Sequence, residues 1–282
     1  MPQLTYSRLQ GKQRPMTQQA STAGLTQAAA THTLGVVSYL NARPLYDCLT
    51  DRDDLTLKAA VPADLAEMLL DDRCDVALLP IVDYWRNKAD LQPVSDACIA
   101  SDGETMTVRV FSKQPAGEVR RLHIDGDSHT SIILAQIIWR ELYDSRLELI
   151  PWKPDNHDGL DETDALLLIG DKVVSRSPAG FGFEVDLGSA WKYLTGLPFV
   201  FACWYGAAEA DFTELATILS AARDRGQAEA ERIARQYAAQ HNWPQDTAVQ
   251  YLARTLKYEL TDPMQTAMDR FFSLAVDHGL LS

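Results

Sequence analysis

Two short polar stretches combine side chains that could bind and polarise a small ligand. Asn41 follows the apolar run of residues 34–40, and its carboxamide can both donate and accept hydrogen bonds. Ser128, Thr130 and Ser131 lie in the stretch "DGDSHTSII", where a helix is predicted to begin. A carboxylate at that point would meet the hydroxyls, the free backbone N–H groups and the favourable helix dipole together. The two stretches therefore predict a site for a small anion.

Local structural roles are the alternative for the same residues. Asn41 could form an Asx turn before the helix that is predicted to begin at Pro44. Ser128 or Thr130 could cap the helix that follows them, and a capping role is compatible with ligand binding.

Three further polar residues lie near predicted strand ends. Ser38 comes just before Asn41 and is expected to contact the same ligand. Arg43 could supply positive charge to a dianion, although an ion pair at the surface is the simpler role. Asp171, which ends the run "DALLLIGD", could orient a group of the site or cap a helix.

The elements that must position these residues alternate along the chain. From residue 34 onward, β-rich runs and helical periodicity follow one another, which predicts an α/β fold built from βαβ units. Strands are predicted at residues 34–40, 55–61, 75–81, 106–112, 147–152 and 164–171, and residues 121–142 as a strand, a polar turn and a helix. Helices are predicted at residues 44–51 and 63–73, a linker around residues 90–103, and a long helical segment from Asp211 onward.

This order of elements predicts two lobes with a ligand crevice between them. Residues 1–33 are expected to be a disordered extension. Lobe 1 is predicted to comprise residues 34–106 and 199–282, and lobe 2 residues 107–198. In hinge-closing folds of this kind, loops at strand ends and helix N-termini contact the ligand from both lobes.

The composition excludes some classes of partner. The 282 residues include 26 Lys and Arg against 39 Asp and Glu, a net charge of -13, so nucleic acid and anionic membrane surfaces are poor partners. No stretch approaches the ~18 apolar residues of a membrane span. The four cysteines lack metal-site or redox spacing, which indicates free thiols in a reducing compartment. Residues 1–33 lack an apolar signal-peptide core, and Met16 could be the true start, so a cytoplasmic location is expected.

Six collinear runs resemble the menaquinone-biosynthesis chorismate dehydratase family (MqnA), within a group that also contains the related naphthoate-forming enzyme (MqnD). They extend from about Gly35 to Tyr205 and read "VSYLNARPL", "PADLAEMLLDDRCDVALLPIVDYWRN", "SDGETMTVRVFSK", "SHTSIILAQ", "DALLLIGD" and "DLGSAWKYLTGLPFVFACW". The C-terminal runs "YLARTLKYEL" and "FFSLAVDHGLL" resemble the family as well. The resemblance implies a type-II periplasmic-binding-protein-like fold with the active site in the crevice between the lobes.

The resemblance also implies an activity. Enzymes of this family dehydrate chorismate to 3-[(1-carboxyvinyl)oxy]benzoate, the first step of the futalosine route to menaquinone, with neither a metal nor an organic cofactor. Asn41, in "NARP", is by this resemblance a catalytic residue. Thr107 stands where the family usually has a serine, so the hydroxyl is kept with an added methyl group. A threonine with a purely structural role in a strand is the alternative.

The chemistry of the implied reaction needs a proton acceptor. Neither Asn41 nor Thr107 has a pKa suited to a general base near neutral pH. Glu104 and His129 lie within the matched runs, but nothing in the sequence places either beside them. The hypothesis is therefore that a carboxylate of the substrate accepts the proton, while Asn41 and Thr107 hold the ring and the departing hydroxyl.

Two other functions are consistent with the same fold. One is a non-enzymatic protein that binds small anions, which as a transport receptor would need an export signal. The other is the sister naphthoate-forming lyase of the same pathway, in which an Asn-Asp motif is expected in place of "NARP".

Overall fold

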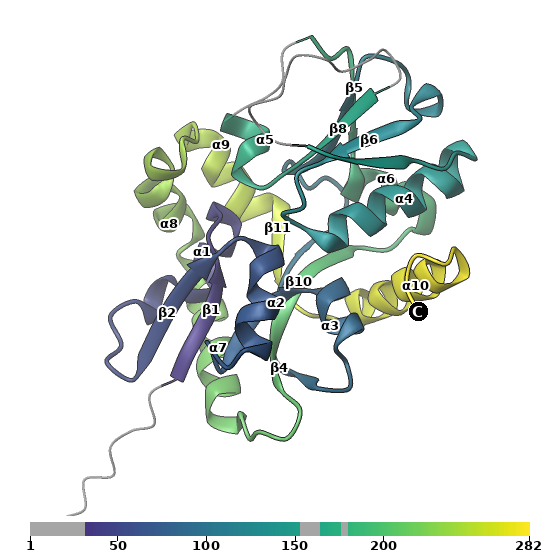
Figure 1. Cartoon of the computed structure of the whole chain (residues 1–282). Coiled ribbons are helices and arrows are strands. Elements are labelled where there is room, and N and C mark those ends of the chain that lie inside the picture. The colour runs from purple at the N-terminus through teal and green to yellow at the C-terminus, as the bar shows by residue number, and fades with distance from the viewer. Residues whose placement is uncertain (1–31, 153–163, 176–179) are drawn as a thin grey trace, which may run out of the picture. The chain divides into compact units, whose positions relative to one another are not determined.

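The computed structural model describes residues 32–152, 164–175 and 180–282, which belong to one compact unit, Thr31–Ser282. Its strands form two mixed sheets (Figure 1). The first has the order β11-β4-β10-β3-β1-β2, made of β1 His32–Val37, β2 Leu55–Ala60, β3 Val76–Pro80, β4 Leu91–Ser101, β10 Phe199–Ala207 and β11 Leu256–Glu259. The second has the order β7-β6-β8-β5-β9, made of β5 Val108–Ser112, β6 Arg121–Ile124, β7 Glu148–Pro151, β8 Asp164–Ile169 and β9 Phe183–Asp186.

Helices cover both sheets. Helix α2 packs on β1 and β3, α7 on β4 and α1, and α4 on α6 and α10 (Figure 1). The helices are α1 Arg43–Tyr46, α2 Pro62–Leu70, α3 Ile81–Arg86, α4 His129–Tyr143, α5 Asp171–Ser175, α6 Leu187–Thr195, α7 Thr213–Ala228, α8 Ala230–Tyr237, α9 Gln245–Gln250 and α10 Asp262–Asp277. The α/β class is thus as predicted, and the face of α2 that carries Leu65, Met68 and Leu69 is buried, as its periodicity indicates.

The chain passes from the first sheet to the second between β4 and β5 and returns through α6 into β10. The predicted boundaries of the two lobes remain a proposal, because the described residues form a single compact unit. Of the expected extension, residues 1–33, the part up to residue 31 lies outside the described residues. His32 and Thr33 belong to β1. This strand starts earlier than the predicted strand of residues 34–40, and it also ends earlier, at Val37.

The linker predicted around residues 90–103 is wrong, because residues 91–101 form the strand β4. The Asp, Ser and Pro residues of this stretch suggested a connection between domains. Pro93 is tolerated because it pairs with β10 alone, whereas the neighbouring strand β11 pairs with β4 only from Ala97 to Ser101. Because β11 does not pair with β4 at Pro93, the missing N–H of the proline removes no hydrogen bond on that side of the strand.

The long helical segment predicted from Asp211 onward is interrupted. A π-helical turn, Tyr251–Thr255, leads directly into β11, which pairs with β4. Residues of β11 alternate between buried and exposed, a pattern of period two that good helix formers on either side obscured.

All four cysteines are free thiols, and burial raises the pKa of each. Every helix in the described part of the chain is too short or too polar to cross a membrane.

Candidate active site

A cavity lies where the two sheets meet. Its walls come from the end of β1, the residues before β5, the start of α4, the end of β8 and the π-helical turn. Its polar lining residues are Tyr39, Asn41, Thr105, Thr107, Ser128, Ser131 and Tyr251. The apolar walls include Val37, Ile99, Val108, Ile169, Phe201 and Leu256. A mostly apolar cavity with a few convergent polar groups is typical of a site for a small molecule.

Asn41 projects into this cavity from a 3-10 turn, Leu40–Ala42, that directly follows β1. Strands β2 and β3 both pair parallel with β1, so their carboxyl ends meet at the same edge of the sheet. Asn41 Oδ1 is buried and has no hydrogen-bond partner in the described residues. An Asx turn would need Oδ1 to accept a backbone N–H, so the amide is not used to form this turn. The side chain is instead an acceptor available to a ligand.

Thr107 lies just before β5, where the chain enters the second sheet, and is buried. Its Oγ1 atom is 2.6 Å from the hydroxyl oxygen of Tyr251. The Tyr251 ring stacks on Trp243, with ring centroids 4.8 Å apart. Burial raises the pKa of Tyr251 well above its usual value, so the phenol stays protonated. Sequence reasoning missed Tyr251, because it lies in a stretch that was predicted to be an ordinary helix.

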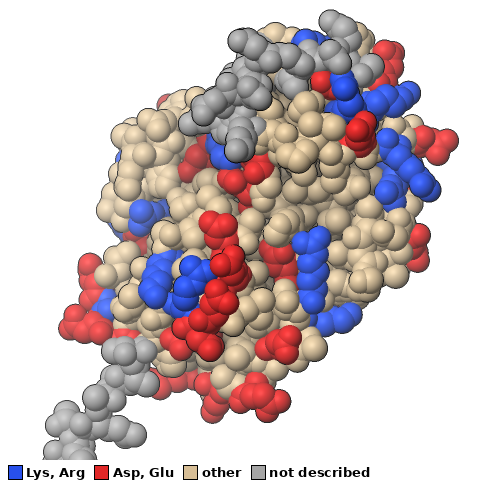
Figure 2. Space-filling model, in the orientation of Figure 1, with Lys and Arg blue, Asp and Glu red and all other residues tan. Residues whose placement is uncertain are grey.

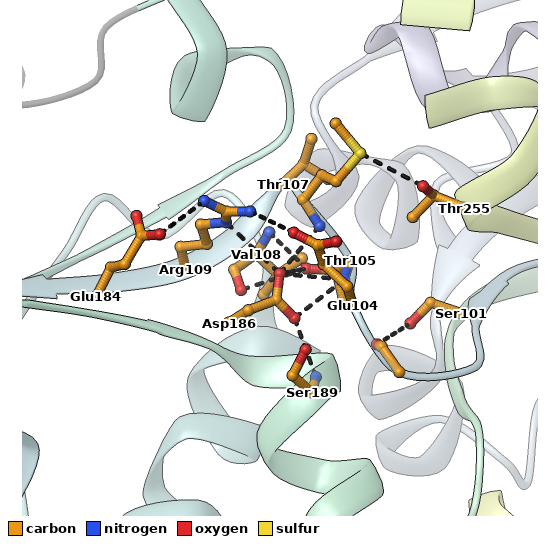
Figure 3. Close-up of polar contacts among 12 residues, drawn as sticks. Ser101, Glu104, Thr105, Thr107, Val108, Arg109, Glu184, Asp186, Ser189 and Thr255 are labelled. Carbon is orange, nitrogen blue, oxygen red and sulfur yellow. Dashed lines mark hydrogen bonds and ion pairs between the residues drawn. The ribbon is translucent and has the colours of Figure 1, made fainter. Parts of the chain in front are cut away.

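The segment before Thr107 is held by a single carboxylate, Asp186 (Figure 3). Asp186 Oδ2 accepts hydrogen bonds from the Thr105 hydroxyl and from the Met106 N–H, both at 2.9 Å. Its Oδ1 accepts from the Ser189 N–H at 3.0 Å and thereby caps helix α6. Met106 has a φ of 62°, a left-handed conformation that a non-glycine residue adopts at a cost. Asp186 therefore fixes the strained residue that directs Thr107 into the cavity.

The hydroxyl cluster at the start of α4 is divided between two faces. Ser128 caps the helix, since its Oγ accepts from the Ser131 N–H at 3.3 Å, and both serines line the cavity. Thr130 is fully buried and does not line the cavity. Its hydroxyl accepts from the Val82 N–H at 3.2 Å. At 100° per residue, positions 128 and 131 lie on one face and position 130 on the other. Two of the three hydroxyls thus reach the cavity.

Asp171 does not line the cavity but connects three segments around it. Its carboxylate accepts from the Leu40 N–H at 3.2 Å and from Trp243 Nε1 at 2.9 Å. The Nδ1 atom of His241 is 2.7 Å from Asp171 Oδ2. Because Leu40 precedes Asn41 and Trp243 stacks on Tyr251, Asp171 positions both sides of the site.

Two residues expected to contact the ligand lie outside the cavity lining. The Ser38 N–H continues the pairing of β1 by donating to the carbonyl of Ala60 at 2.9 Å. The guanidinium of Arg43 stacks on the ring of Tyr237, 4.1 Å from its centroid. Neither is among the residues that line the cavity.

The cavity has no cationic side chain in its described lining. Lys172, nearby in sequence to Gly170 of the lining, is paired with Asp125 and Asp127. Tyr39 donates to Asp127 at 2.5 Å, and burial and that carboxylate hold the pKa of Tyr39 well above its usual value. On the face shown in Figure 2, acidic and basic side chains are intermixed, without a continuous basic field. An anion in the cavity would therefore be held by neutral hydroxyls and the N-terminus of α4.

Comparison with known proteins identifies related sequences. The profile of a family described as menaquinone biosynthesis matches residues 32–277. The chain is 29% identical over 197 residues to a chorismate dehydratase of Thermus thermophilus, a match that covers 61% of this chain and 69% of that enzyme.

Solved structures identify the fold. Protein AF1704 from Archaeoglobus fulgidus matches with a TM-score of 0.70 at 14% identity, over 89% of this chain and 98% of that chain. The periplasmic aliphatic sulphonate binding protein of Escherichia coli matches with a TM-score of 0.62 at 11% identity, over 90% and 88% of the two chains. At these identities the likeness concerns the fold, and it confirms the expected periplasmic-binding-protein-like architecture.

Proposed function

The chain belongs to the menaquinone biosynthesis family, and from this premise we propose that it is a chorismate dehydratase of the futalosine pathway. The reaction is a hydro-lyase step that converts chorismate to 3-[(1-carboxyvinyl)oxy]benzoate. The observation that carries the proposal is the unpaired acceptor of Asn41, which lines the same cavity as the Thr107 hydroxyl. The similarity to a chorismate dehydratase supports the choice of substrate.

The reaction removes one ring proton and the hydroxyl on the neighbouring carbon. The C–H electron pair becomes part of the aromatic ring, the C–O bond breaks, and the hydroxyl leaves as water after gaining a proton. Tyr39 and Tyr251 are held protonated by their raised pKa values, so neither is suited to remove the ring proton. We assign that role to a carboxylate of the substrate. The protein holds the reacting groups in line through Asn41 and Thr107.

The N-terminus of α4 is the proposed site for a substrate carboxylate. Ser128 and Ser131 present their hydroxyls there, and their side-chain oxygens lie 3.0 Å apart. The dipole of this 15-residue helix favours negative charge at the same point. The substrate dianion is thus held without a lysine or arginine in the described lining.

The test is incubation of the purified full chain with chorismate, followed by separation of the products and mass spectrometry. The expected result is 3-[(1-carboxyvinyl)oxy]benzoate together with one equivalent of water. Binding of chorismate without turnover would instead support a small-anion-binding protein. In a parallel incubation with the cyclised intermediate, release of a dihydroxynaphthoate, with chorismate untouched, would support the sister lyase.

Thr107 gives a test of the hydroxyl contact. Thr107→Ser keeps the hydrogen-bonding group, so we expect turnover near or above that of the parent. Thr107→Val is nearly isosteric but deletes the hydroxyl. The substrate group that the hydroxyl contacts would then be buried without a partner, which costs roughly 1–3 kcal/mol. The valine variant should lose at least several-fold in turnover, measured as steady-state rate per active site.

The number of active sites in each Thr107 variant should be counted by ligand titration. This control is needed because Tyr251 also loses its 2.6 Å partner in the valine variant, which lowers stability. A valine variant as fast as the parent would leave Thr107 with the structural role alone.

A further inference from the structure

Tyr39 connects two of the segments that supply polar groups to the cavity. It comes two positions before Asn41, and its buried side chain lines the cavity as well. Its hydroxyl donates a hydrogen bond to Asp127 Oδ2 at 2.5 Å. Asp127 directly precedes Ser128, which caps α4 and lines the cavity. One side chain thus joins the turn that carries Asn41 to the start of α4.

The carboxylate that accepts this hydrogen bond is held in place by its own neighbours. Lys172 Nζ contacts Asp127 Oδ2 and lies 2.6 Å from Asp125 Oδ2. The Asp127 N–H donates to Asp125 Oδ1 at 3.1 Å. The Asp127 carbonyl accepts from the Ala63 N–H at 3.1 Å, at the start of α2. Asp127 is therefore a fixed anchor for the Tyr39 hydroxyl.

The ring of Tyr39 packs against a residue that is bonded to Thr107. Gly170, directly after β8, has a φ of 61°, and a Cβ atom there would be 2.6 Å from Cδ2 of Tyr39. Glycine allows both this φ and this close approach of the ring. The Gly170 N–H donates to the carbonyl oxygen of Thr107 at 2.9 Å. The ring is thus in contact with the segment that holds the backbone of Thr107.

The proposed function needs two groups of polar residues at a set distance from each other. It places a substrate carboxylate beside Ser128 and Ser131, which form the carboxylate site. It places the departing hydroxyl beside Asn41 and Thr107, which form the hydroxyl site. We infer that Tyr39 is a positioning residue that sets the spacing between the carboxylate site and the hydroxyl site.

This inference rests on the proposed function and adds a rule of specificity to it. A ligand that carries both a carboxylate and a hydroxyl gains from both sites only where their spacing matches its own. A ligand that carries a carboxylate alone does not depend on that spacing. Loss of the Tyr39 hydrogen bond should therefore affect the two kinds of ligand differently.

The first experiment measures the binding of 4-hydroxybenzoate and of benzoate by isothermal titration calorimetry. Both probes carry a ring carboxylate, and 4-hydroxybenzoate adds a hydroxyl at C4, the carbon that carries the hydroxyl in chorismate. We expect the parent to bind 4-hydroxybenzoate about three- to tenfold more tightly than benzoate. Tyr39→Phe keeps the ring against Gly170 but deletes the hydroxyl. This variant should lose most of the preference and keep the parental affinity for benzoate.

Three further variants separate positioning from a general effect on β1. Tyr46→Phe is the matched control, because the buried Tyr46 hydroxyl donates to the carbonyl of Val37, at the end of β1, at 3.3 Å. It loses a hydrogen bond to the same strand but none to Asp127, so it should keep the preference. Asp127→Asn keeps an oxygen that can accept from Tyr39 and should keep the preference as well. Asp127→Ala should lose the preference as Tyr39→Phe does.

Turnover of chorismate gives a second readout. Tyr39→Phe and Asp127→Ala should each lower kcat about tenfold, because the reacting groups are no longer held in line. The double variant should lower kcat no further, since both changes remove the same hydrogen bond. Losses that multiply, or parental kcat in Tyr39→Phe, would contradict the inference. Thermal unfolding and ligand titration of each variant show whether a lower rate reflects less folded protein.

The binding results decide the inference independently of turnover. A parent without a preference for 4-hydroxybenzoate, or a Tyr39→Phe variant that keeps the parental preference, would overturn it. A Tyr46→Phe variant that loses the preference would overturn it too, since the effect would then belong to β1 as a whole. A parent that shows the preference but fails to dehydrate chorismate would refute the proposed function. The loss of preference in Tyr39→Phe would still show that Tyr39 sets the spacing of the two sites.

Discussion

Asn41→Ala is expected to lower the turnover of chorismate by a factor of about 100–1,000, or ~2.7–4 kcal/mol of activation free energy. The amide contributes to the reacting geometry through its buried, unpaired Oδ1. The free energy of unfolding should stay close to that of the parent. Removing a buried acceptor that has no partner in the described residues relieves a desolvation cost and offsets the packing that is lost. Steady-state kinetics and thermal unfolding measure the two quantities.

The control for this variant is Asn87→Ala. Asn87 Nδ2 donates to the carbonyl of Asp83 at 2.8 Å, at the end of α3, and Asn87 does not line the cavity. We expect this variant to lose some stability and to keep parental turnover. Parental turnover in Asn41→Ala would remove Asn41 from the reaction, and an Asn41→Ala protein that cannot fold would restore the turn-forming alternative.

The parts of the fold that the sequence predicted are those that local patterns determine. Strand β3 is an unbroken buried run, and α2 has apolar side chains at helical spacing, so each could be recognised without its neighbours. Strands β4 and β11 depend on partners far away in sequence, since β4 lies between β10 and β11. Their local composition favoured a linker and a helix, and tertiary pairing overrode both.

The candidate site shows the same division. Asn41 and Thr107 were named on family resemblance, and the structure places both in one cavity with Ser128 and Ser131. Tyr251 could not be found in this way, because its place beside Thr107 is produced by a π-helical turn that the surrounding helical pattern conceals. Residue type and spacing thus identified the hydroxyls at the start of α4, and the resemblance identified Asn41 and Thr107, but neither identified a group brought in by a distant segment.

The position of Asn41 depends on the helix that follows it. Helix α1 begins at Arg43, directly after the 3-10 turn that carries Asn41, and α7 packs against it. Gly226 of α7 lies so close that a Cβ atom there would be 1.6 Å from the carbonyl oxygen of Pro44. The contact is with backbone, so no side chain can turn aside to make room. One of the two helices must move if position 226 gains a methyl group.

Gly226→Ala is therefore expected to lower both stability and turnover. Alanine gains up to about 1 kcal/mol over glycine from helix propensity, but overpacking costs typically ~1–3 kcal/mol and more where backbone must shift. Because the displaced α1 carries Asn41 with it, turnover per folded molecule should also fall, as thermal unfolding and active-site-normalised kinetics would show. Gly182→Ala is the control, since a Cβ there meets no atom within 4 Å. If Gly226→Ala matched the parent in both measurements, the packing of α7 on α1 would not be what places Asn41 in the cavity.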